Sequence, residues 1–262
     1  SLLADYHDRR TRSRAMSIHQ TSVYLGTIGG GALVGLLAER FGWRSPFLLF
    51  GLIGLLYALM LVTVLKEPPR GKPAPLVEVD DFPTPEIATS PRSSLASEVL
   101  AVVRHPSAAL LIAAFTCANF VAMALVTWLP MFVYTKFQFG VAKSATIGTV
   151  FMQSGSLVGA LTGGFLADRL VSRFVGGRMI VQTIALTLGA PCVFLLGTLD
   201  AVEGVMAAMV GVGLCKGLYD ANIFASLYDV VPAAQRGLAA GMMNTIGWVG
   251  GLLAPLVIGI AS

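Results

Sequence analysis

The stretch GVMAAMVGVGLCKGLYDANIFASLYDV, residues 204–230, decides the fold of this chain. It is 27 residues long, and only Lys216, Asp220 and Asp229 carry charge. An α-helix needs about 20 predominantly apolar residues to cross a bilayer. The stretch therefore predicts a membrane-spanning helix. It also raises a question, because a cation and a carboxylate lie four residues apart inside an apolar run.

Six further apolar runs of similar length share this character. They cover residues 17–37, 45–65, 108–134, 145–167, 179–199 and 238–260. The chain is 55% hydrophobic and 12% charged, whereas an ordinary soluble domain is about a quarter charged. Its polar residues gather in a few short clusters, which argues against a large soluble domain with an oversized core. Because lipid offers the backbone no hydrogen-bond partner, each run must be helical. The sequence predicts an all-α membrane protein with seven spans in a lipid bilayer.

The basic residues predict the orientation of these spans. The connections before the first span and after the second, fourth and sixth hold thirteen Lys and Arg residues, and the opposite connections hold four. Basic residues favour the cytoplasmic side, so we expect a multi-pass protein of the cell's inner (plasma) membrane. The RRTRSR cluster at 9–14 lies beside a membrane helix, where topology and anionic lipid explain it. No nucleic-acid partner is expected.

The residue types that build enzyme centres are scattered. The three cysteines all fall inside expected spans, and the three histidines are far apart in the sequence. This leaves neither a disulfide framework nor metal-ligand spacing. GTIGGG at 26–31 lacks the Gly-Lys-Ser/Thr of a phosphate-binding loop. Because no nucleophile or cofactor constellation is present either, we expect no enzyme activity, catalytic residue, metal or cofactor.

One long connection separates the second and third spans. Residues 66–107 hold eight of the thirteen prolines together with mixed charges, a composition that cannot bury a core. We expect an extended cytoplasmic linker that divides residues 1–65, with two spans, from residues 108–262, with five. Its end, SLASEVLAVVR at 94–104, predicts a short amphipathic helix on the membrane surface.

Two segments at opposite ends of the chain resemble each other. LADYHDRRTRSRA at 3–15 and LYDVVPAAQRGLA at 227–239 both carry an Asp followed by an Arg at the same spacing. A G-x-x-G-G pattern follows inside the next helix in both places. Two loop-plus-helix units recurring six spans apart indicate a transporter built from two related six-helix halves.

The stretch GGFLADRLVSRFVGGR, residues 163–178, resembles the Gly-x-x-x-Asp-Arg/Lys loop signature of the major facilitator superfamily. Gly164, Asp168 and Arg169 match it, whereas the Gly-Arg-Arg part that should follow is stretched into LVSRFVGGR. The resemblance covers essentially the whole chain, including AERFGWR at 38–44 and WLP at 128–130. It implies a helical bundle of two pseudo-symmetric halves that is incomplete here. The chain would hold spans five to eleven of twelve, and the complete protein would be monomeric.

The resemblance also implies a function and a gate. Members of the family move small solutes by secondary active transport through alternating access. The family's loop Asp bonds the N-terminal end of a helix from the other half, so Asp168 is expected to face the start of the first span near Ser17. Gly164, Arg169 and Arg173 would complete this loop. Alternatively, Asp168 and Arg169 are solvated loop charges that follow the positive-inside rule.

Glycines at four-residue spacing run along several spans. Such small-residue stripes let helices approach closely. They occur at Gly26/Gly30, Gly31/Gly35, Gly155/Gly159/Gly163, Gly213/Gly217 and Gly247/Gly251. The family layout places most of them where the two halves meet, which would suit sliding or rocking. Static helix packing explains the same spacing equally well.

Lys216 and Asp220 require an explanation of their own. On a helix, Lys216, Tyr219, Asp220 and Ser226 fall within about 120° of one another and share a face. Because a charge at the bilayer centre costs about 3 kcal/mol, this face should look inward. Either the two charges form only a structural pair, or Lys216 attracts a substrate anion while Asp220 serves as counter-ion or proton-coupling site.

Four further polar residues within spans, Asn119, Gln153, Asn222 and Asn244, are candidates to bind a solute or to bond neighbouring helices. The intramembrane lysine favours a small organic anion, such as a sugar acid or a sugar phosphate, with proton or counter-anion coupling. The alternative is a non-transporting membrane sensor of the same fold that binds a solute and signals to a partner.

Overall fold

The computed structural model describes residues 7, 10–64, 94–174 and 176–261. Every regular element in these residues is helical, which confirms the all-α prediction. In chain order the helices are α2 (Arg12–Phe41), α3 (Ser45–Val64), α4 (Leu95–Arg104), α5 (Pro106–Phe137), α6 (Val141–Val171), α7 (Gly177–Thr198), α8 (Val202–Val230), the 3-10 turn η1 (Ala233–Gln235) and α9 (Arg236–Ala261).

Each expected apolar run lies on one long helix within one residue of its bounds, and Leu65, the last residue of the second run, lies outside the described residues. Helices α5 and α6 have 32 and 31 residues. Since an α-helix rises about 1.5 Å per residue, both are longer than the roughly 30 Å hydrocarbon layer, and their ends reach past it. Six of the described helices, α3 and α5 to α9, are long and apolar enough to cross a membrane. Helix α2, which carries the first expected span, is not among the six, so its crossing remains a prediction.

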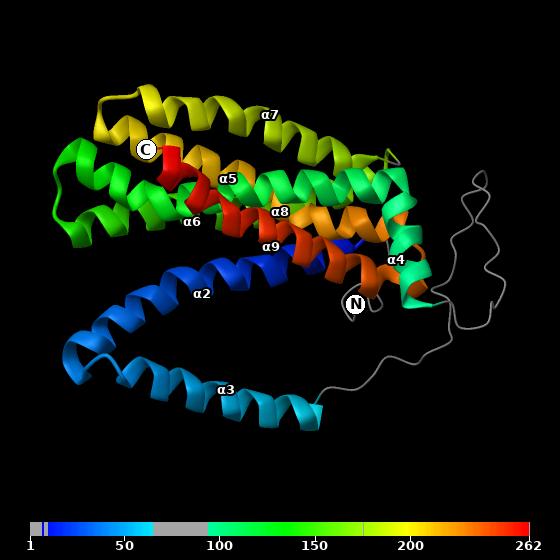
Figure 1. The fold of residues 1–262 in the computed structure, drawn as a ribbon, viewed down its shortest axis with the longest axis horizontal. Helices are drawn as coiled ribbons and strands as arrows, with labels where there is room; N and C mark the ends of the chain where they lie inside the picture. The colour runs from blue at the N-terminus through cyan, green and yellow to red at the C-terminus, as the bar shows by residue number, and fades with distance from the viewer. Residues whose placement is uncertain (1–6, 8–9, 65–93, 175, 262) are drawn as a thin grey trace.

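Most of the predicted linker, residues 66–93, lies outside the described residues. Its last part forms the predicted short helix α4, which lies across one end of the bundle in Figure 1. The Ser94 hydroxyl caps α4 by accepting a hydrogen bond from the backbone N–H of Ser97 at 3.3 Å. Helix α5 begins at Pro106, a residue whose fixed backbone angle suits a first helical position. The place of α4 on a membrane surface remains a prediction.

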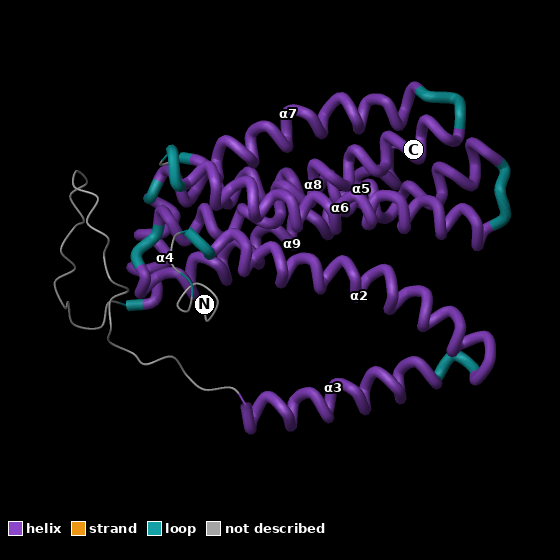
Figure 2. The backbone as a smooth tube through the Cα atoms, turned by 180° about the vertical axis from the view of Figure 1, so that it is seen from behind, coloured by secondary structure: helices purple, strands orange, loops and turns teal. Residues whose placement is uncertain are grey.

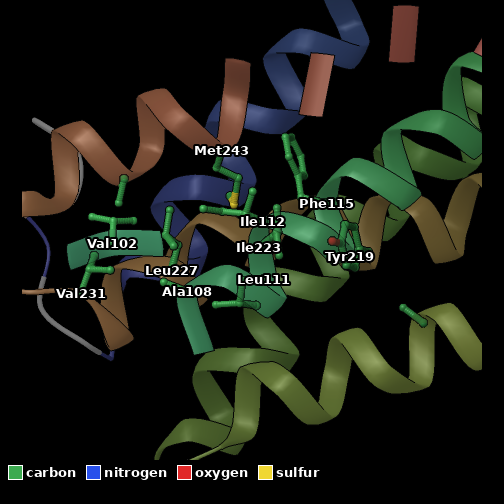
Figure 3. Packing of buried hydrophobic residues seen from close by; sticks show 12 residues of the cluster. Val102, Ala108, Leu111, Ile112, Phe115, Tyr219, Ile223, Leu227, Val231 and Met243 are labelled. Atoms are coloured by element: carbon green, nitrogen blue, oxygen red, sulfur yellow. The ribbon is translucent and has the colours of Figure 1, made fainter. Parts of the chain in front are cut away.

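Helices α5 to α9 form one tightly packed bundle around α8 (Figures 1 and 2). One hydrophobic cluster joins α4, α5, α7, α8 and α9 near the end that carries α4, and Figure 3 shows its side chains. A second cluster joins α5, α6, α7 and α8. Large apolar side chains point outward along the same helices; Leu110 and Phe194 are 71% and 70% exposed. So much outward apolar surface suits lipid rather than water.

Glycines allow α6 and α8 to touch backbone to backbone. A Cβ atom on Gly159 would lie 2.0 Å from the carbonyl oxygen of Leu214, and one on Gly217 would lie 2.0 Å from that of Ser156. The α9 glycine Gly247 packs against side chains of α5, since a Cβ atom there would lie 2.4 Å from a ring carbon of Phe115. Among the described residues these stripes pack α6 against α8 and α9 against α5, which favours static helix packing. A sliding contact between the two halves remains a prediction.

Helices α2 and α3 stand apart from this bundle. Helix α2 leans against α6 and α8 near its start and then diverges from them, while α3 packs against α2 at the far end (Figures 1 and 2). None of the apolar window of α3 is buried among the described residues. The contact between the N-terminal helix pair and the five-helix bundle is thus concentrated on the first half of α2.

Candidate functional site

Asp168 of α6 caps the N-terminal end of α2. Its carboxylate oxygens accept hydrogen bonds from the backbone N–H groups of Ser13 at 3.2 Å and Arg14 at 3.0 Å. The first N–H groups of a helix have no intrahelical partner, and the helix dipole favours negative charge there. Asp168 therefore does, from another helix, what an N-cap side chain does within its own. It lies in the last turns of α6 rather than in a loop, because that helix continues to Val171.

A buried arginine joins this cap to α8. Arg178, at the start of α7, is 2% exposed and donates from Nε to the Ser13 hydroxyl at 2.6 Å. Its guanidinium lies 3.6 Å from Asp168 and also forms an ion pair with Asp229 of α8. Arg12 of α2 pairs with the same Asp229 at 3.2 Å. Arg14 Nε also lies 3.6 Å from Asp168, so two carboxylates pair with three guanidinium groups where four helices meet.

The other residues of the resembled signature take different positions. A Cβ atom on Gly164 would lie 2.4 Å from the hydroxyl oxygen of Ser17, so this glycine lets α2 approach α6. Asp168 is 3% exposed and is therefore not a solvated charge. Arg169 and Arg173 are exposed. Arg178 occupies the place beside Asp168, and the Gly-Gly-Arg ending of the stretched signature was its only sequence signal.

A second contact between the same parts of the chain lies farther along α2. The Tyr24 hydroxyl donates to Oδ2 of Asp220 at 2.5 Å, and the Lys216 ammonium lies 2.5 Å from the same oxygen. Lys216 also donates to the Tyr24 hydroxyl at 3.1 Å. Tyr24 is 3% exposed, and the side chains of Lys216 and Asp220 are 22% and 17% exposed. Sequence reasoning paired the two charges and missed the tyrosine.

The expectation of one shared face on α8 is only half right. Lys216 and Asp220 face α2, whereas Tyr219 packs against α5 in the cluster of Figure 3. Ser226 faces α7, where its hydroxyl accepts a hydrogen bond from Gln182 at 2.5 Å. Helix α8 lies at the centre of the bundle. Residues that share one face in a helical projection therefore contact different neighbouring helices.

Several buried polar atoms have no hydrogen-bond partner among the described residues. The sequence candidates in this group are Asn119 Nδ2, Gln153 Oε1, Asn222 Oδ1 and Tyr219 Oη, and Trp128 Nε1 of α5 joins them. All five belong to the five-helix bundle. Asn244 of α9 is exposed and is not brought near them by any described contact. Since buried polar groups are normally paired, these atoms are open to a bound solute or water.

Comparison with known proteins places this geometry in a family. The family model described as "Major Facilitator Superfamily" matches residues 1–255. The chain is 26% identical to the chloroplastic sodium-dependent phosphate transport protein 1 of Arabidopsis thaliana, over 97% of this chain and 49% of that protein. It is 27% identical to the chloroplastic ascorbate transporter of Arabidopsis thaliana, over 92% and 44%.

A bacterial relative is similarly distant. The hexuronate transporter of Bacillus subtilis (strain 168) is 22% identical, over 95% of this chain and 58% of that protein. The chain thus spans about half the length of the curated relatives it matches. Both the family and these relatives are transporters rather than enzymes. With six described helices fit to span a membrane and a family match over nearly its whole length, the chain is part of a multi-pass membrane protein and belongs to the major facilitator superfamily.

Proposed function

We propose that the full-length protein is a secondary transporter that moves a small organic anion across the plasma membrane by alternating access. The observation that carries this proposal is the cap that Asp168 of α6 places on the start of α2. It ties the N-terminal helix pair to the five-helix bundle at the end where the basic residues gather, which we assign to the cytoplasm. The protein works as a monomer.

The cap is suited to open and close. When α2 moves away from α6, the N–H groups of Ser13 and Arg14 and the carboxylate of Asp168 replace their hydrogen bonds to each other by hydrogen bonds to water. Such an exchange changes the free energy by only about 1 kcal/mol, because both partners stay hydrogen-bonded. A substrate that binds the two states unequally is able to shift a balance of this size. The cap therefore acts as a cytoplasmic gate and not as a permanent brace.

Lys216 is the proposed anion site. It is the one Lys or Arg inside the apolar runs, and it faces the contact between α2 and α8 with part of its side chain exposed. Asp220 neutralises it as its counter-ion and is the candidate proton-coupling site. The unpaired polar atoms of Asn119, Gln153 and Tyr219 would bond hydroxyl groups of a sugar acid or sugar phosphate. Phosphate, ascorbate and hexuronate, which the relatives' names mention, are all anions.

Replacing Asp168 by Asn is expected to open the cytoplasmic end. Asn keeps the size of the side chain but removes the charge that the helix dipole and Arg178 stabilise, so the closed state should lose about 1 kcal/mol, or about fivefold in population. Ser17 is fully buried behind the cap, which makes Ser17→Cys a near-isosteric reporter. In full-length protein with its other cysteines removed, Asp168→Asn should raise the labelling rate of this cysteine about fivefold.

Asp200→Asn is the matched control for this experiment. The Asp200 side chain is 97% exposed and pairs with Lys136 at 3.3 Å, away from the cap, so its loss should leave labelling unchanged. Equal labelling of Ser17→Cys with and without Asp168→Asn would remove the gate assignment. Solute uptake into vesicles by the wild type separates transport from the alternative of a solute sensor, which would bind the anion without moving it.

A further inference from the structure

The contact between Tyr24, Lys216 and Asp220 combines two features that a simple ion pair lacks. Its members come from different parts of the chain, with Tyr24 192 and 196 residues away from the two charged residues. The ammonium also lies 4.9 Å from the centre of the Tyr24 ring, so it touches both the face and the hydroxyl of the tyrosine. The contact therefore exists only while α2 lies against α8.

The Lys216 ammonium and the Asp220 carboxylate neutralise each other within the protein. Oδ2 of Asp220 accepts from the ammonium and from the phenol, and the phenol oxygen accepts from the same ammonium. An intramembrane charge that loses its partner is strongly disfavoured unless water or another ion replaces that partner. When a movement of the protein removes water from around Lys216, either Asp220 or another anion must therefore lie next to its ammonium group.

We infer that Asp220, held in place by the Tyr24 hydroxyl, substitutes for the substrate anion at Lys216 during the half of the cycle in which no substrate is carried. This inference rests on the proposed function. A bound carboxylate or phosphate competes with Asp220 for the ammonium, and the Tyr24 hydroxyl then retains Asp220 as its acceptor. Lys216 is neutralised in both halves of the cycle, by the solute in one and by the protein in the other. Tyr24 is a positioning residue here and does not touch the solute.

The two halves of the cycle are measurable separately. Exchange of labelled for unlabelled anion across a vesicle membrane uses only the loaded carrier, whereas net uptake into vesicles without internal anion also needs the carrier to return unloaded. Asp220→Asn leaves Lys216 without an internal counter-charge, and Tyr24→Phe leaves Asp220 without its positioning donor. With inorganic phosphate and a hexuronate as probes, and with both rates set against the amount of monodisperse protein, Asp220→Asn should lower the ratio of net uptake to exchange about tenfold or more.

Tyr24→Phe should lower the ratio of net uptake to exchange by about threefold. The ion pair between Lys216 and Asp220 persists in this variant, but Asp220 loses the hydrogen bond that positions it. Tyr134→Phe is the matched control, since that tyrosine of α5 is 41% exposed and should leave both rates unchanged. Equal losses of exchange and net uptake in both variants, unchanged rates, or a wild type that exchanges without net uptake would each overturn the inference while leaving the proposed function intact. A wild type that does neither would overturn the proposed function itself.

Discussion

Replacing Lys216 by Ala is expected to abolish anion uptake by the full-length protein, and removing Asp220 as well is expected to restore folding without restoring transport. Lys216→Ala strands a carboxylate in the apolar bundle, which costs about 3 kcal/mol on insertion scales. The single variant therefore risks poor folding. The double variant Lys216→Ala/Asp220→Ala removes both charges and with them that cost, so it should be recovered as monodisperse protein.

The double variant separates the two readings of the charged pair. If the ammonium binds the substrate, its loss removes a charge-assisted contact worth up to about 3 kcal/mol, and uptake should stay about 100-fold below wild type. If Lys216 and Asp220 only neutralise each other and do not bind the substrate, the double variant should regain both folding and uptake. Initial uptake rates in vesicles, set against the amount of monodisperse protein, decide between them. Recovery of uptake would contradict the assignment of Lys216 as the anion site.

The second large effect concerns the α6–α8 contact. Gly159→Val is expected to prevent recovery of folded protein, because its Cβ would lie 2.0 Å from the Leu214 carbonyl oxygen. That atom belongs to a helix backbone and cannot turn away as a side chain would. Overpacking a core costs about 1–3 kcal/mol when side chains adjust, and a backbone clash should exceed that range. Yield and thermal stability of detergent-solubilised protein measure the effect.

Gly197→Val is the matched control for this substitution. Gly197 lies on α7 with nothing within 4 Å of its added Cβ, so this variant should change stability by only a few tenths of a kcal/mol. A Gly159→Val protein as stable as Gly197→Val would show that α6 and α8 do not pack backbone to backbone, and the arrangement of the bundle around α8 would be wrong.

The helices were predictable because their signal is local. Seven apolar runs near membrane thickness correspond to seven long helices of the described chain, and six of them, all but α3, extend from one to several residues beyond at least one end of the run. The extensions were harder to see, because charged residues such as Asp168 and Arg169 end an apolar run without ending a helix. Residues 66–93 lie outside the described part of the chain, so the predicted linker remains a prediction there.

The contacts between helices were predictable only in part. Resemblance to the family's loop signature directed attention to Asp168 and the start of α2, although the structure places the contact at Ser13 and Arg14 rather than at Ser17. Tyr24 gave no signal, since a lone tyrosine in an apolar run is as typical of packing as of a polar contact. Its partner lies 196 residues away, and no local spacing reports such a pair.

The central claim is that the full-length protein carries an organic anion from one side of the membrane to the other, and uptake by purified protein in sealed vesicles tests it most directly. With labelled ascorbate, a hexuronate and a sugar phosphate as probes, the account predicts that at least one accumulates saturably inside vesicles containing the wild type and fails to do so with Lys216→Ala/Asp220→Ala. Saturable binding of these anions with no movement into the vesicle interior would contradict it.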